Sequence, residues 1–255
     1  HRTAMKRKVP IHRNVKDLKA IGEQQLESVS ATCASKEVSY DATTLLVSEG
    51  VIPNTSLIRQ IGCDHTWDPI QRYWHPDVQE DGRTNLPAVF VAGDGHFVHG
   101  AKSAELKGRL TGLTIAREMN RLSKEEYQTL TTPVRRELET ELLPRPFIDA
   151  LYAPRPHLYK MPESTLVCRC EGVTAGQIRD LVQDGLTDHN EIKAIIRCGM
   201  GPCQGRMCGS AVHELIVEES GIAPDKARQH RLRPPIKPVS LQELANAELG
   251  DSNES

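Results

Sequence analysis

Four cysteines in two pairs are the residues of this chain whose spacing is most informative about chemistry. Cys168 and Cys170 form a Cys-x-Cys pair, and Cys203 and Cys208 form a Cys-x4-Cys pair beyond an intervening stretch of helical pattern. Thiolates in two groups that the fold brings together can hold a [2Fe–2S] cluster. Glycines surround the second pair, so the backbone can approach the sulfurs and turn N–H groups toward them, which helps to set a cluster potential.

Other uses of these thiols stay open on spacing alone. A structural zinc site also takes four cysteines, but its pairs are typically separated by two to four residues, and Cys-x-Cys is shorter than that. Buried thiols without a metal are a second alternative. Disulfides are disfavoured because no secretory signal is recognisable, and for the same reason we expect a cytoplasmic protein. The spacing does not exclude Cys198, close to the second pair, as a ligand.

Residues 168–221 resemble the bacterioferritin-associated-ferredoxin-like (BFD-like) [2Fe–2S] domain. The resemblance is carried by Cys168-Arg169-Cys170-Glu171-Gly172-Val173-Thr174, by Glu191-Ile192-Lys193, and by Gly199-Met200-Gly201-Pro202-Cys203-Gln204-Gly205-Arg206-Met207-Cys208. The simplest members of that family have Cys-x-x-Cys as their second pair. The longer spacing here resembles the A (alpha) subunits of opine oxidases and of hydroxyproline or proline dehydrogenases. The resemblance implies that Cys168, Cys170, Cys203 and Cys208 hold the cluster and that Cys198 is a bystander.

A second signal lies between residues 88 and 122. The apolar run 88–92 predicts a short buried strand, which Gly93-Asp94-Gly95 closes, and Gly100-Ala101 opens a predicted helix to about Leu122. A carboxylate at a strand end followed by a helix N-terminus suits a nucleotide cofactor. The Asp94 carboxylate can accept from sugar or ribityl hydroxyls, and the helix end favours an anionic oxygen. Such corners are common in α/β proteins, so this one carries little weight alone.

Residues 88–116 resemble the second FAD-binding motif of the flavoproteins with two dinucleotide-binding domains. Residues 49–55 and the Trp67–Trp74 segment are similar to other parts of that class and of the opine-oxidase-like A subunits. The resemblance implies that Gly93, Asp94, Gly95 and Ala101 contact FAD, although the large residues 96–99 depart from its pattern. No Gly-x-Gly-x-x-Gly follows a predicted strand. We therefore expect FAD to bind only with a missing N-terminal half, present in a longer chain or supplied by a separate one.

The predicted fold is α/β, the C-terminal part of a two-dinucleotide-binding-domain flavoprotein, followed by a small, mainly helical [2Fe–2S] domain. Alternating residues predict strands at 26–32 and 36–41, and an apolar run predicts a buried strand at 43–50. Ser123 and Thr174 are predicted helix N-caps. The expected divisions are residues 1–122 for the flavoprotein part, 123–163 for a connector, 164–221 for the cluster domain, and 222–255 for a Pro-rich, partly disordered tail. The connector is expected to begin as a charged helix and to continue as an extended, Pro-rich arm between residues 144 and 162.

The composition gives no general reason to expect nucleic acid as a partner, since the 255 residues have a formal net charge of −2. No apolar run is long enough to cross a membrane. Trp67, Tyr73 and Trp74 are interpreted as a local hydrophobic cluster under a long loop.

These patterns predict an electron-transferring subunit of an FAD and [2Fe–2S] oxidoreductase. By resemblance, a second flavoprotein subunit is its partner, and an opine, hydroxyproline or proline is oxidised there. The alternatives are an NAD(P)H-dependent reductase with the same flavin and cluster, and a non-catalytic [2Fe–2S] binding module. No catalytic acid or base is predicted in this chain, and neither the substrate nor the electron acceptor is indicated.

Overall fold

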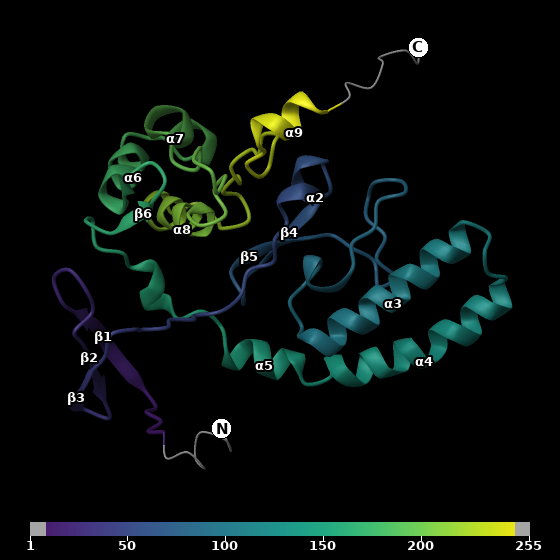
Figure 1. The fold of residues 1–255 in the computed structure, drawn as a ribbon, viewed down its shortest axis with the longest axis horizontal. Helices are drawn as coiled ribbons and strands as arrows, with labels where there is room; N and C mark the ends of the chain where they lie inside the picture. Colours follow the sequence, from purple (N-terminus) through teal and green to yellow (C-terminus); the bar gives the residue numbers. More distant parts are fainter. Residues whose placement is uncertain (1–8, 248–255) are drawn as a thin grey trace. The chain divides into compact units, whose positions relative to one another are not determined.

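The computed structural model describes residues 9–247, and the chain divides into two compact units between Glu49 and Gly50 (Figure 1). Each unit is described by itself below. The disorder expected at the end of the tail falls on residues 248–255, which lie outside the described residues.

The first unit contains a three-stranded antiparallel sheet in the order β1 (Val15–Ile21), β2 (Ser28–Cys33), β3 (Lys36–Asp41). The central strand carries the buried side chains, among them Ala31 and Cys33. β2 and β3 pair from Cys33 opposite Lys36 to Ser28 opposite Asp41, so they form the predicted hairpin. The alternation in the sequence therefore indicates both strands correctly.

The strand predicted at residues 43–50 is wrong. No strand includes these residues, and the side chains of Leu46 and Val47 are 91% and 63% exposed. A strand needs a partner edge for its backbone hydrogen bonds, and the described residues offer this run none. The run has the apolar composition of a buried strand. Within residues 9–247, however, no neighbouring strand pairs with it.

The second unit begins with the short helix α2 (Ser56–Gln60) and the hairpin of β4 (His65–Asp68) and β5 (Tyr73–Pro76). Trp67 lies directly opposite Trp74 in this hairpin, and the two rings meet edge to face with centroids 5.7 Å apart. The strand predicted at residues 88–92 is also wrong, because only Phe90 forms an isolated bridge, to Arg83. As at 43–50, the described residues supply no neighbouring strand to complete a ladder.

Two long helices pack side by side, α3 (Ala101–Glu118) and α4 (Lys124–Leu142) (Figure 1). Leu106, Leu110, Val134 and Leu138 form their shared core. Each such side chain contributes roughly 1.5–3 kcal/mol when it is fully buried. The predicted N-cap is confirmed, since the Ser123 hydroxyl accepts from the Glu126 N–H and the Glu126 carboxylate accepts from the Ser123 N–H.

One face of α3 is open. A Cβ atom added at Gly108 or at Gly112 would meet no other atom within 4 Å. Small residues on a helix normally allow another backbone to approach closely. Among the described residues nothing takes that place.

The connector is less extended than expected. Residues 145–151 form the helix α5 (Arg145–Leu151), and Pro156–Tyr159 form a 3₁₀ turn, η2. Pro144 and Pro146 do not prevent α5 because they lie at its start, where the missing proline N–H leaves no helical hydrogen bond unmade.

A small domain follows, built from a short hairpin and three helices. Its elements are β6 (Leu166–Cys168), β7 (Val173–Thr174), α6 (Ala175–Gln183), α7 (His189–Ile196) and α8 (Gly209–Ser220). Ile178, Ile192 and Leu215, one from each helix, are fully buried in its core. Thr174 is the N-cap of α6, as predicted, in a reciprocal capping box with Gln177.

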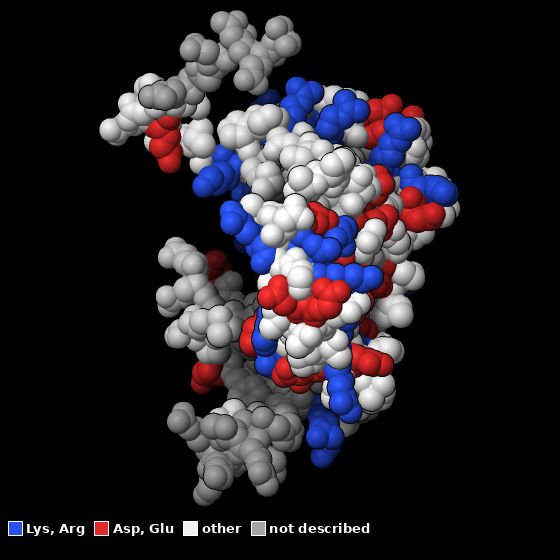
Figure 2. All heavy atoms as spheres, turned by 90° about the vertical axis from the view of Figure 1, so that its right-hand side faces the viewer, with Lys and Arg blue, Asp and Glu red and all other residues white. Residues whose placement is uncertain are grey.

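The last element is α9 (Leu241–Ala245). Among the described residues, no helix is both long and apolar enough to cross a membrane. Figure 2 shows basic and acidic side chains interspersed on the face that it draws.

Candidate metal centre

Five thiols of the helical domain come together. Cys168 ends β6, Cys170 follows in the hairpin turn, and Cys208 is the N-cap residue of α8. The Sγ atoms of Cys168, Cys198 and Cys208 all lie within 4.8 Å of one another, and each of these residues is at most 1% exposed. We call these three the inner thiols.

Cys170 and Cys203 form an outer pair. Cys170 is exposed and Cys203 is partly buried. Burial raises the pKa of the Cys203 thiol, but N–H groups of Met207 and Gly205 and the Cys170 thiol outweigh burial and lower that pKa. Backbone N–H groups therefore point at a sulfur, as the glycines around the second pair led us to expect. A lowered pKa favours the thiolate, which is the form that binds metal.

Among the inner thiols, the pKa of Cys208 is shifted in the opposite direction to that of Cys203. The Cys198 thiol and then burial raise the pKa of Cys208 above its ordinary value. Crowded, buried thiols resist ionisation because their thiolates repel one another and lack water. A cation between them removes that penalty, so the donor set fits an iron–sulfur cluster chemically.

A glycine allows the two halves of the centre to approach. A Cβ atom at Gly201 would stand 2.1 Å from Cys170 Cβ and 3.0 Å from its Sγ. No ordinary side chain fits there without moving the backbone. The loop that carries Cys203 can therefore lie against the Cys170 turn only because residue 201 is glycine.

The structure brings Cys168, Cys170, Cys203 and Cys208 to one region, and it brings Cys198 there as well. Spacing had left Cys198 open, and resemblance had made it a bystander. It follows α7 through Arg197, whose backbone is left-handed with a φ of 61° and which turns the chain back toward β6. The ligand set of four stays a prediction.

The residues predicted to contact flavin form a separate corner. Gly93–Gly95 make a 3₁₀ turn, η1, in which Asp94 is exposed, and Ala101 begins α3 after Gly100 without a side-chain cap. The structure thus places all four predicted residues around one turn and one open helix N-terminus. Their role toward FAD stays a prediction.

Residues behind this corner were not singled out from the sequence. Lys107 on α3 is 8% exposed, and burial lowers its pKa to about 8, opposed by the charge of Asp94. Its Nζ lies 3.1 Å from His99 Nδ1. Burial, followed by the Lys107 charge, lowers the pKa of His99 to about 3, so this imidazole is neutral. The signal available in the sequence was the position of Lys107, which lies on the otherwise uncharged face of the predicted helix.

The large residues 96–99 depart from the flavoprotein pattern for a structural reason. The Phe97 ring packs against Tyr73, with centroids 5.4 Å apart, and against His75 and His99. This segment therefore fills the space between the corner and β5 with aromatic side chains.

Comparison with protein families agrees with the two parts of the chain. Residues 166–218 match the family described as BFD-like [2Fe-2S] binding domain. Residues 1–119 match the family described as pyridine nucleotide-disulphide oxidoreductase. The chain is thus a segment of a mixed α/β flavoprotein type joined to a BFD-like [2Fe–2S] domain.

Curated relatives are similar in sequence to this chain over most of its length. The opine oxidase A chain of Agrobacterium tumefaciens is 39% identical over 91% of this chain and 46% of its own length. Its counterpart from Rhizobium meliloti is 36% identical over 91% of this chain and 44% of its own length. Hydrogen cyanide synthase subunit HcnB of Pseudomonas protegens is 32% identical over 71% of this chain and 38% of its own length. The chain is a homologue of the opine oxidase A chains and spans about half of their length.

A solved structure shares the fold. The crystal structure of L-proline dehydrogenase from P. horikoshii superposes with a TM-score of 0.69 over 91% of this chain and 44% of that chain, at 23% identity. It supports the architecture, an α/β flavoprotein part followed by the helical domain.

Proposed function

We propose that this chain is part of an electron-transferring subunit of an FAD and [2Fe–2S] oxidoreductase. The observation that carries the proposal is the convergence of five thiols in a domain that matches the BFD-like family. The proposed substrate is an amino-acid-derived secondary amine such as an opine, hydroxyproline or proline, oxidised with a second flavoprotein subunit. Support for this class comes from the relatives, which are subunits of opine oxidase and hydrogen cyanide synthase.

Cys168, Cys170, Cys203 and Cys208 would hold the cluster, which supplies one-electron chemistry when bound. The chain's own residues prepare an asymmetric site for it. The core of the helical domain excludes water from Cys168 and Cys208, whereas Cys170 faces solvent. Backbone N–H groups of residues 205 and 207 favour the thiolate at Cys203. The side of the outer pair, where Cys170 is exposed, is therefore the side that a partner can approach.

The flavin would be held jointly with the rest of a longer protein. Asp94 offers a carboxylate and Ala101 a helix N-terminus, but no described Gly-rich turn is available for a pyrophosphate. The proposed partners are thus the remaining half, in the same or a separate chain, and the amine-oxidising subunit. We further propose a cytoplasmic location, which the seven free cysteines support.

The cofactor role of Asp94 can be measured. In protein that includes the remaining half, Asp94→Ala should weaken FAD binding at least about tenfold, because it removes charge-assisted hydrogen bonds worth roughly 1.5–3 kcal/mol each. The 255-residue chain alone should bind FAD poorly. Titration of FAD, followed by flavin fluorescence, measures both. Tight binding by the chain alone, or an unchanged affinity for Asp94→Ala, would contradict the assignment.

The proposed reaction is distinguished from its alternatives by what reduces the cluster. We expect the visible absorption of the oxidised cluster to bleach anaerobically on addition of an opine, hydroxyproline or proline. Bleaching should require the full-length subunit together with its amine-oxidising partner. Bleaching by NADH or NADPH without amine would favour the reductase instead. A cluster that neither reagent reduces in the full assembly would favour a non-catalytic binding module.

A further inference from the structure

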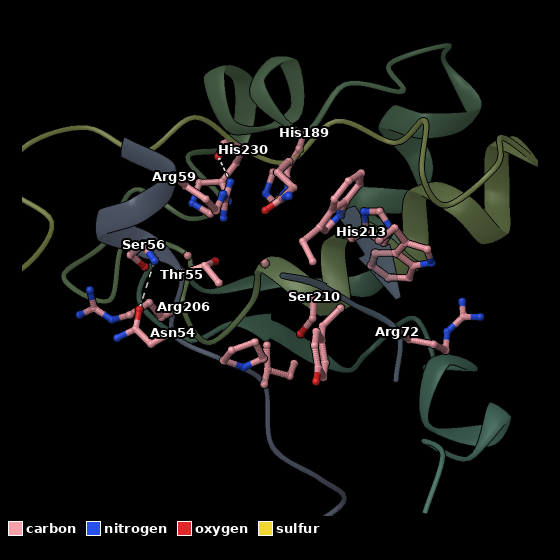
Figure 3. A pocket seen from close by; sticks show the side chains of 18 residues that line it. Asn54, Thr55, Ser56, Arg59, Arg72, His189, Arg206, Ser210, His213 and His230 are labelled. Carbon is pink, nitrogen blue, oxygen red and sulfur yellow. Dashed lines mark hydrogen bonds between the residues drawn. The ribbon is translucent and has the colours of Figure 1, made fainter. Parts of the chain in front are cut away.

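A hollow in the second unit lies beside the metal centre and is not used by the proposed function. It is a cavity of about 240 Å³ between the β4–β5 hairpin region and the helical domain. Figure 3 shows Arg59, His230 and His189 along one edge, His213 farther along, and Ser210 on the opposite side. All of these residues belong to the second unit.

Buried nitrogen atoms line this cavity without a partner. His189 is 1% exposed and His213 is 5% exposed. Nε2 of His189, both ring nitrogens of His213 and Nε1 of Trp74 make no hydrogen bond among the described residues. Buried polar atoms in native proteins are almost always paired, so the wall of this cavity holds hydrogen-bonding capacity that the described residues leave unused.

The cavity also carries positive charge that no carboxylate cancels. Arg59 donates from Nη2 to the His230 carbonyl at 2.7 Å and forms no ion pair within residues 9–247. Burial lowers the pKa of Arg59 to about 10, so it remains charged near neutral pH. Glu214, close to His213 in α8, is already paired with Arg72.

The N-terminus of α8 adds to this field. Gly209 and Ser210, the first two residues of that helix, line the cavity, and no side chain caps the helix. The Gly209 N–H already donates to the Gly205 carbonyl at 2.7 Å, and the helix dipole with the N–H groups that follow favours an anion at this end. Arg59 and the N-terminus of α8 therefore both favour an anionic group.

Aromatic rings form the rest of the wall. Trp67 stacks on His213 with ring centroids 4.5 Å apart and an interplanar angle of 30°, and Trp74 meets the same imidazole edge-on. Flat π surfaces accept a flat ring, and their faces are apolar. A volume of 240 Å³ suits a single-ring compound.

We propose that this cavity binds a monocyclic aromatic anion, with its ring against the Trp67–Trp74 wall and its carboxylate or phosphate between Arg59 and the N-terminus of α8. The site adjoins the metal centre. A Cβ placed on Gly199 would be 4.0 Å from both His189 Nε2 and Cys208 Sγ, so the two atoms are separated by no more than the sum of those distances. Binding is independent of which substrate the proposed oxidoreductase uses.

Four probes separate the contributions of ring and charge. We expect phenyl phosphate and benzoate to bind to the full chain, and phenol and inorganic phosphate to bind at least about tenfold more weakly, because each lacks one half of the recognised group. Isothermal titration calorimetry gives the affinities. Trp67 and Trp74 are the two tryptophans of the chain, so tryptophan fluorescence reports on this cavity. The tighter of the two aromatic anions shows whether phosphate or carboxylate is preferred.

Variants test the position. Arg59→Gln should weaken binding of both aromatic anions at least about tenfold and leave phenol unaffected, since phenol carries no charge for the guanidinium to bind. The matched control is Arg121→Gln, because Arg121 is an exposed arginine after α3. This variant should leave the affinity for all four probes unchanged. Ser210→Asp places a carboxylate in the first turn of α8, where it favours the helix but repels an anion, so it should also weaken binding.

Three outcomes would overturn the proposal. They are phenol binding as tightly as the aromatic anions, inorganic phosphate binding as tightly as phenyl phosphate, and unchanged affinity in both Arg59→Gln and Ser210→Asp. Circular dichroism of each variant separates lost binding from lost folding. Because the probes bind without turnover, this result does not depend on the proposed reaction.

Discussion

Replacing any one of Cys168, Cys170, Cys203 and Cys208 by Ser should abolish cluster binding. A serine hydroxyl is a far poorer ligand for iron than a thiolate, so each of these substitutions would leave one iron incompletely coordinated. Protein prepared anaerobically should contain iron and sulfide in the ratio of a [2Fe–2S] cluster and absorb visible light. Each variant should lose both the metal and the colour.

The control variants are Cys33→Ser, Cys63→Ser and Cys198→Ser, which should keep the cluster. Cys198 is the most informative of the three, because its Sγ lies within 4.8 Å of those of Cys168 and Cys208. Loss of iron from Cys198→Ser would show that the ligand set includes this inner thiol. Stoichiometric zinc in protein prepared without oxygen would end the iron–sulfur assignment altogether.

Gly201→Ala should prevent the centre from assembling even though every thiol is retained. The new methyl group would stand 2.1 Å from Cys170 Cβ, a distance that a real Cβ essentially never shows, so the loop must move away from the Cys170 turn. Overpacking of this kind typically costs about 1–3 kcal/mol. Because coordination depends on the relative position of the outer pair, iron content should fall more than helix content.

Gly108→Ala is the matched comparison. Its added methyl group would meet no atom within 4 Å, and it lies inside α3. Alanine is favoured over glycine in a helix by about 1 kcal/mol, so this variant should keep its iron and be slightly more stable in thermal unfolding. Equal iron contents in the two variants would show that the close approach at residue 201 is dispensable.

Two helix caps and one hairpin were predicted well from local patterns, because their signals are complete within a few residues. Ser123 and Thr174 satisfy backbone donors three residues away, and both capping boxes are present. The hairpin of β2 and β3 is likewise specified by alternation and a tight turn. Such features need no information from distant parts of the chain.

Features that depend on a distant partner were predicted poorly. Residues 43–50 and 88–92 have the composition of buried strands, yet the described residues give them no partner edge. The position of Cys198 depends on how α7 ends at Arg197, and spacing alone does not reveal a left-handed residue there. The cavity around Arg59 and His189 joins residues far apart in sequence, so no local motif could indicate it.

The exposed run beginning at Leu45 has a consequence for handling the protein. Leu46, Val47, Val51 and Ile52 are 91%, 63%, 64% and 54% exposed. An exposed, apolar, β-prone segment that lies in no sheet is a template for pairing with another copy of itself. When the chain is produced without the part that its longer relatives have in addition, we expect this segment to nucleate aggregation. Charged substitutions at residues 46 and 47 should delay that aggregation without touching the metal centre.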